Sequence, residues 1–197
     1  MRICSLLPSA TEIVADLGLA DSAVAVSEEC DWPPEVRSLP VVTASRVDTS
    51  MLSSLGIEQA VRDAIGDGRP LYAIDRELLE ALKPDLILTQ NLCAVCAVPA
   101  DEFCATEAEI VALDAHTLAE IEECIASLAD LLGVPARGRA VVNEMKATIA
   151  AVTKRVARAP PRPVFGAEWL DPPYVAGHWI PEDGRLGRSA RGSASLA

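Results

Sequence analysis

Two of the six cysteines, Cys93 and Cys96, are separated by two residues. Thioredoxin-like redox centres use this spacing, with the first thiolate stabilised at a helix N-terminus, and metal sites use it to bring two sulfurs onto one ion. Cys30 is the candidate third ligand because its loop is expected at the same sheet edge. Zinc or another metal at Cys30, Cys93 and Cys96, thiol-dependent chemistry, and inert buried thiols are therefore three open interpretations.

Four further side chains follow predicted strands and are candidate ligand contacts: Ser9, Glu29, Trp32 and Gln90. In an open parallel sheet, ligands bind outside the carboxyl ends of the strands. Ser9 and the amides that begin its helix can donate hydrogen bonds to an acidic or amide-bearing ligand, or Ser9 can simply cap that helix. Trp32 can form a flat apolar wall for a large ligand or close the edge of the domain.

Aromatic residues are rare but gather in one place. Four of the seven lie within 15 residues, namely Phe165, Trp169, Tyr174 and Trp179. Trp169 and Trp179 are candidate walls for a ligand. His178, one of two histidines, precedes Trp179 and either contacts a ligand or stabilises the turn before Pro181.

The elements that must position these residues alternate between strand and helix. The predicted strands are Arg2–Leu7, Ala23–Val26, Leu71–Ile74, Asp85–Thr89 and Ile110–Leu113. Ser9 and Glu12 have the spacing of a capping box, with Gly18 as the helix stop, and Asp75 begins a helix that reaches Leu82. Continuous apolar strands between helices predict an α/β fold with a Rossmann-like parallel sheet and right-handed crossovers.

The second part of the chain begins with helices. Thr117 and Glu120 form another predicted capping box, with Gly133 as the stop. A longer helix is expected over residues 136–159, followed by prolines and by short strands at 164–167 and 174–176. One apolar seam runs along this helix, at Val142, Met145, Ile149, Val152 and Val156. Such a helix is either packed in the ordinary way or a strut between two lobes.

Composition limits the possible functions. The 197 residues carry a formal net charge of −12, and residues 1–135 hold 24 acidic and 7 basic residues, which argues against nucleic acid as a partner. The sequence shows no membrane span and no secretion signal, so as written we expect a cytoplasmic protein. It also lacks a nucleophile elbow and a glycine-rich phosphate loop, and we predict no catalysis.

Four blocks in order resemble a known family: RICSLLPSATE at 2–12, ECDWP at 29–33, LILTQNLCAVC at 86–96 and EWLDPPYVAGHW at 168–179. They are similar to the cobalamin-binding, periplasmic-binding-protein-like group of ABC-importer substrate-binding proteins. The resemblance implies two Rossmann-like lobes, a rigid connecting helix, a ligand in the cleft between them, delivery to an importer permease and an extracytoplasmic role. It also implies that His178 lies in that cleft, where its imidazole can approach a corrinoid cobalt.

The expected organisation has four parts. We expect residues 1–117 to form the Rossmann-like lobe, 118–159 the helical segment with the long interdomain helix, 160–183 part of a second α/β lobe, and 184–197 a disordered basic tail. The resemblance breaks off near Glu182, so we expect a truncated second lobe. The leading hypothesis is binding of cobalamin or another corrinoid or metal chelate. A cytoplasmic metal or thiol protein using Cys30, Cys93 and Cys96, and a product without a ligand, are the alternatives.

Overall fold

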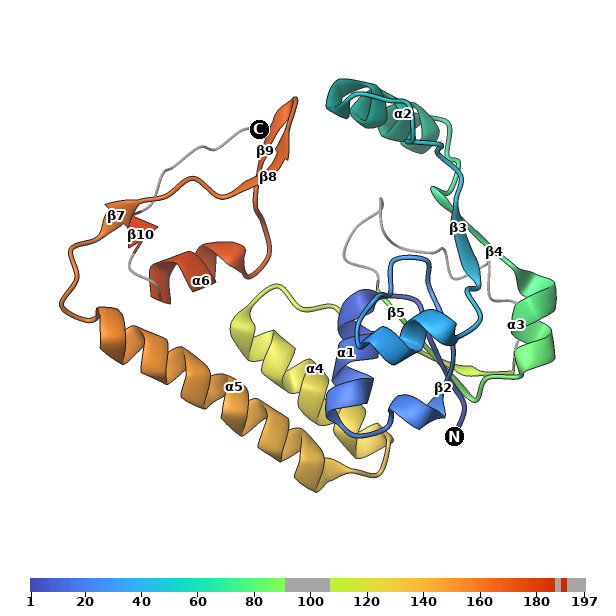
Figure 1. Cartoon of the computed structure of the whole chain (residues 1–197), viewed down its shortest axis with the longest axis horizontal. Helices are drawn as coiled ribbons and strands as arrows, with labels where there is room; N and C mark the ends of the chain where they lie inside the picture. Colours follow the sequence, from blue (N-terminus) through green and yellow to red (C-terminus); the bar gives the residue numbers. More distant parts are fainter. Residues whose placement is uncertain (91–106, 187–188, 191–197) are drawn as a thin grey trace. The chain divides into compact units, whose positions relative to one another are not determined.

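The computed structural model describes residues 1–90, 107–186 and 189–190. The chain divides into two compact units, Met1–Asp114 and Ala115–Ala197 (Figure 1).

The first unit is built on a four-stranded parallel sheet with strand order β2-β1-β5-β6. Its strands are β1 (Ile3–Ser5), β2 (Ala23–Val26), β5 (Leu86–Thr89) and β6 (Glu109–Ala112). Every residue of β1 and β5 is buried, as expected for central strands covered on both faces. This sheet confirms the predicted α/β class and four of the predicted strands.

Helix α1 (Pro8–Asp16) starts one residue earlier than its predicted cap. Leu7 occupies the N-cap position and makes no side-chain cap hydrogen bond, while Ser9 is an exposed residue inside the first turn. The predicted Ser9–Glu12 capping box is therefore wrong. Pro8 explains the shift, because a proline fits the first helical position, where no N–H partner is needed. Gly18 adopts a positive φ of 70°, as predicted for the helix stop.

A second, two-stranded sheet joins β3 (Thr43–Ser45) to β4 (Tyr72–Ile74) in antiparallel pairing. Helix α2 (Ser54–Gly66) lies between them in sequence, and α3 (Arg76–Leu82) follows with the Asp75 carboxylate accepting the Leu78 N–H, as predicted. The sequence predicts the strand at 71–74 as part of the parallel sheet, but β4 pairs with β3 instead. The residues of β4 are only partly buried, which suits a small outer ribbon.

Short helical turns connect the remaining parts of the first unit. They are η1 (Ala20–Ser22) and η2 (Pro34–Ser38). One apolar cluster lies on the sheet, with Cys4 of β1 packed among buried residues of β2, β5, α3 and the segment before β3: Ala25, Val42, Leu79 and Ile87.

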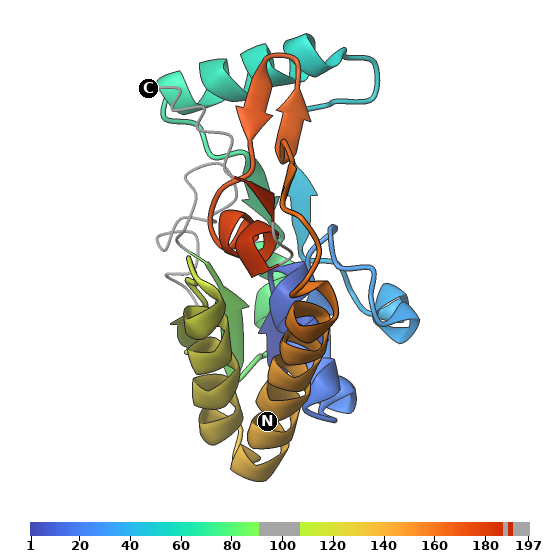
Figure 2. The ribbon, with the colours of Figure 1, turned by 90° about the vertical axis from the view of Figure 1, so that its left-hand side faces the viewer.

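The second unit begins with two adjacent helices, α4 (Leu118–Leu131) and α5 (Pro135–Val156), which lie side by side in Figures 1 and 2. Thr117 and Glu120 form the predicted capping box, and Gly133 has a φ of 73°. The 22 residues of α5 make it about 33 Å long. The helices pack closely at Gly138, where an added Cβ would lie 2.4 Å from the Ala129 Cβ.

The remainder of the second unit holds short strands and one helix. They are β7 (Arg162–Pro163), β8 (Ala167–Leu170), β9 (Pro173–Val175), α6 (Ile180–Leu186) and β10 (Ser189–Ala190). β8 and β9 form a hairpin, and β10 pairs with β7. The sequence predicts a disordered tail from Gly184, but α6 continues through Leu186. Pro181, Glu182 and Asp183 in its first turn favour the start of this helix.

Candidate functional site

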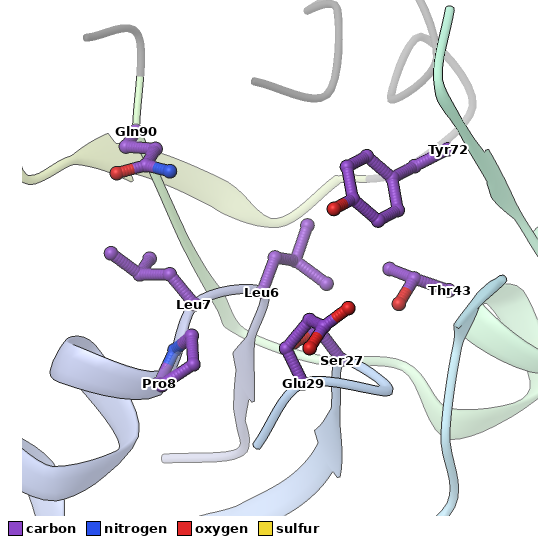
Figure 3. A pocket seen from close by; sticks show the side chains of 8 residues that line it. All are labelled: Leu6, Leu7, Pro8, Ser27, Glu29, Thr43, Tyr72 and Gln90. Carbon is purple, nitrogen blue, oxygen red and sulfur yellow. The ribbon is translucent and has the colours of Figure 1, made fainter. Parts of the chain in front are cut away.

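A cavity of about 190 Å³ opens at the carboxyl ends of the parallel strands in the first unit (Figure 3). Eight residues line it: Leu6, Leu7, Pro8, Ser27, Glu29, Thr43, Tyr72 and Gln90. Figure 3 shows Leu7, Pro8 and Gln90 on one side of the space, with Thr43 and Tyr72 on the other. The cavity thus combines aliphatic walls with hydroxyl, amide and carboxylate groups.

Strand topology explains why these residues meet. Parallel strands end at the same edge of a sheet, so the segments after β1, β2 and β5 bring Leu6, Glu29 and Gln90 together. The β3–β4 ribbon joins this edge through a bridge between Val26 and Val41, which are paired in parallel. That ribbon contributes Thr43 and Tyr72.

A buried polar network holds the first two of these segments together. The Thr11 hydroxyl lies 2.8 Å from Ser5 Oγ and 3.1 Å from Cys30 Sγ, and Ser27 Oγ lies 3.2 Å from the same sulfur. All four side chains are buried, at 6% exposure or less. Because buried polar groups are costly when unpaired, this network favours one arrangement of α1 and the loop after β2.

Backbone hydrogen bonds fix the turn that carries Glu29. The Ser27 N–H donates to the Ser5 carbonyl at 3.0 Å, and the Cys30 N–H donates to the Ser27 carbonyl at 3.1 Å. The Glu28 N–H donates to Thr43 Oγ1 at 3.0 Å, which ties the turn to β3. The Glu29 side chain is therefore attached to a backbone that is held on both sides.

The cysteines that the structure describes are not arranged as a metal site. Cys30 is buried and its sulfur already lies beside Thr11 and Ser27. Burial, with a smaller contribution from nearby Cys30, raises the pKa of the Cys4 thiol to about 12. In residues 1–90, 107–186 and 189–190, no three His, Cys, Asp or Glu side chains are grouped to hold a metal ion. Cys93 and Cys96 lie outside the described residues.

The structure brings together only part of the predicted contacts in this unit. Glu29 and Gln90 line the cavity, whereas Ser9 and Trp32 do not. Ser9 is exposed on α1, and Trp32 is 59% exposed in the loop after β2. Sequence reasoning missed Tyr72 and Thr43. Tyr72 had a usable signal, as one of two tyrosines and within a predicted strand, whereas Thr43 had none.

The second unit contains an aromatic group of its own. The rings of His116 and His178 are stacked with centroids 5.6 Å apart, and Trp179 lies 5.9 Å from His178. His178 is exposed and has a positive φ of 52°, while Trp169 lies in β8 and donates its indole N–H to the Asp171 carbonyl at 3.0 Å. Sequence reasoning did not include His116 among the ligand contacts, although it is the other of the two histidines.

A hydrogen bond connects α6, which follows His178 and Trp179 in sequence, to the start of α4. The Glu182 carboxylate in α6 accepts the Leu118 N–H at 3.0 Å. That N–H belongs to the first helical turn, where amides lack partners within the helix. Glu182 thus joins α6 to α4 beside the stacked imidazoles.

Among the helices that the structure describes, none is long and apolar enough to cross a membrane.

Residues 3–180 match the family described as periplasmic binding protein. A vitamin B12-binding protein from Photorhabdus laumondii is 25% identical over 165 residues, which cover 84% of this chain. The match covers 50% of that relative, so the chain spans about half its length.

Two solved structures show the same fold. The periplasmic vitamin B12 binding protein of Vibrio cholerae is 25% identical with a TM-score of 0.69, covering 96% of this chain and 64% of that one. The periplasmic heme-binding protein RhuT from Roseiflexus sp. RS-1 is also 25% identical, with a TM-score of 0.57 and coverage of 84% and 54%.

Proposed function

The chain belongs to the periplasmic binding protein family, and from this premise we propose that it binds cobalamin or a related corrinoid without transforming it. The ligand would be received extracytoplasmically and delivered to the permease of an ABC importer. The cavity at the carboxyl ends of β1, β2 and β5 is the observation that carries this proposal.

The chemistry of the cavity suits one edge of such a ligand. A corrin ring is largely apolar and is fringed with amide side chains. Leu6, Leu7 and the ring of Tyr72 supply apolar contact, while Gln90 and Glu29 supply hydrogen-bonding groups. Pockets that enclose a whole drug-sized ligand are usually about 300 Å³ or larger, so a cavity of about 190 Å³ would take only part of the macrocycle.

The similar proteins support this class of ligand. Two are described as vitamin B12-binding and a third as heme-binding. Cobalamin and heme both hold a metal in a flat nitrogen macrocycle, and a site with apolar walls and a few polar groups is compatible with either. We propose the corrinoid because Gln90 and Glu29 complement amide groups.

Contacts from the other predicted residues remain part of the proposal. In the second unit, Trp169 and Trp179 offer flat surfaces, and the His178 imidazole is a suitable ligand for cobalt. In the first unit, Ser9 and Trp32 lie outside the cavity wall, and we propose only peripheral contact for them.

Isothermal titration with cobalamin tests the proposal. The wild-type chain should bind it, and Gln90→Ala should weaken binding about threefold to tenfold, the effect of losing one or two hydrogen bonds. Gln59→Ala is the matched control, because Gln59 is an exposed residue of α2 that hydrogen-bonds Asp63. The absorption spectrum of cobalamin, recorded with and without the protein, is the second measurement. If the wild type gives neither heat on titration nor a shift in this spectrum, the proposed function is contradicted.

A further inference from the structure

We propose that Glu29 makes the cavity select macrocycles with uncharged amide side chains and reject those with carboxylate side chains. This inference rests on the proposed function and adds a determinant of ligand choice to it. The distinction matters because the similar proteins include both vitamin B12-binding and heme-binding ones, and heme carries two carboxylates.

The charged side chain in the cavity wall is negative. Among the eight lining side chains, Glu29 is acidic and none is Lys, Arg or His. A carboxylate accepts hydrogen bonds from amide N–H groups, and these charge-assisted bonds are stronger than neutral ones. A ligand carboxylate placed at the same point offers no proton and brings a second negative charge, so it is repelled.

Neither Arg37 nor Arg46 lines the cavity with Glu29. Arg37 lies 3.5 Å from the Asp31 carboxylate and donates to the Asp31 carbonyl at 3.0 Å. Arg46 donates to the Tyr72 carbonyl at 3.2 Å, but its side chain does not line the cavity. Among the described residues of the wall, a ligand carboxylate in the cavity would therefore meet no basic side chain.

The surrounding unit reinforces this sign of charge. Residues 1–114 contain 20 acidic and 7 basic side chains, a formal net charge of −13. Clustered charge of one sign lowers the local concentration of ligands that carry the same sign. The effect of the unit is diffuse and is screened by salt, whereas the effect of Glu29 acts at the wall.

The backbone of the turn that carries Glu29 is held in place, so the turn cannot readily move to separate the Glu29 carboxylate from a ligand carboxylate. Its neighbours on both sides are held, Glu28 by the N–H bond to Thr43 Oγ1 and Cys30 by its bond to the Ser27 carbonyl. The carboxylate can change rotamer, but its backbone attachment stays at the cavity. The carboxylate of Glu29 therefore stays within side-chain reach of any ligand that enters.

The test compares two ligands that share one corrin ring. Dicyanocobinamide carries amide side chains and dicyanocobyrinic acid carries carboxylates, and cyanide occupies both axial positions in each. Titration of the full chain at neutral pH and low salt should give binding of the amide form about tenfold tighter or more. Glu29→Gln should reduce this ratio at least about threefold, mainly through tighter binding of the acid.

Two variants make the assignment specific. Glu28→Gln removes the same charge from the adjacent exposed residue, which does not line the cavity, and should leave most of the selectivity. Glu29→Asp keeps the charge and should preserve the ratio. Equal binding of both ligands by the wild type, or equal effects of Glu28→Gln and Glu29→Gln, would overturn the inference and leave the proposed function intact. Binding of neither ligand by the wild type would overturn the proposed function as well.

Discussion

The hydroxyl of Thr11 lies 3.1 Å from the sulfur of Cys30 and 2.8 Å from the hydroxyl of Ser5. One residue of α1 thereby contacts both the end of β1 and the loop after β2, at the sheet edge where the cavity opens. The buried hydroxyl of Thr11 therefore holds α1, β1 and the loop after β2 together, although Thr11 itself does not line the cavity.

Thr11→Val should destabilise the protein by about 1–3 kcal/mol, because Ser5 and Cys30 would lose a buried partner while the volume stays nearly constant. Urea unfolding followed by circular dichroism measures this. Thr11→Ser keeps the hydroxyl and should recover most of the loss. Equal stability of the Val and Ser variants would show that the network contributes nothing.

Alkaline pH should destabilise the protein partly through Cys4. Burial raises its folded-state pKa to about 12 from 9.0, so between these values the folded chain keeps a proton that the unfolded chain releases. The stability from this group is complete below pH 9 and falls by up to about 1.4 kcal/mol per pH unit above it. Cys4→Ala should be less stable at neutral pH yet lose stability less steeply between pH 9 and 11. Parallel pH profiles of the two proteins would refute this effect.

Gly138→Ala should destabilise the α4–α5 pair, although alanine favours helix formation by about 1 kcal/mol. The new methyl would lie 2.4 Å from the Ala129 Cβ, so the helices must move apart. Gly66→Ala in α2 is the control, since an added Cβ there meets no atom within 4 Å and should be neutral or stabilising. Thermal melts compare the two, and an equal shift in Tm would argue against close packing at Gly138.

Glu182→Ala should loosen the connection between α6 and α4. Its carboxylate accepts the Leu118 N–H at 3.0 Å, and without it that amide loses its protein acceptor. Hydrogen exchange at Leu118 should accelerate severalfold, and protease cleavage near α6 should become faster. Asp183→Ala, at the adjacent exposed position, is the matched control. Identical exchange at Leu118 in both variants would count against this hydrogen bond.

The strands of the parallel sheet were predictable because buried runs such as Leu86–Thr89 carry a continuous apolar signal. The Thr117–Glu120 capping box and the Asp75 cap were also readable, since each depends on residues within one helical turn. The start of α1 was not, because Pro8 competed with Ser9 for the same turn and the proline position prevailed.

Two of the eight residues that line the cavity could not be predicted from local sequence, for a related reason. The rule that ligands bind at the carboxyl ends of strands identified Glu29 and Gln90. Thr43 and Tyr72 reach the cavity only through antiparallel pairing of β3 with β4, and the short sequence Thr43–Ser45 has no apolar alternation to announce a strand. The contact of His116 with His178 likewise joins residues far apart in sequence.

Hydrogen exchange with and without saturating cobalamin tests the central claim most directly. We predict that the ligand binds and that protection concentrates in the three segments at the cavity, residues 6–11, 27–30 and 43–45, while amides of α2 change little. Failure to bind, or binding that leaves these three segments unprotected, would contradict the assignment of this cavity as a ligand site.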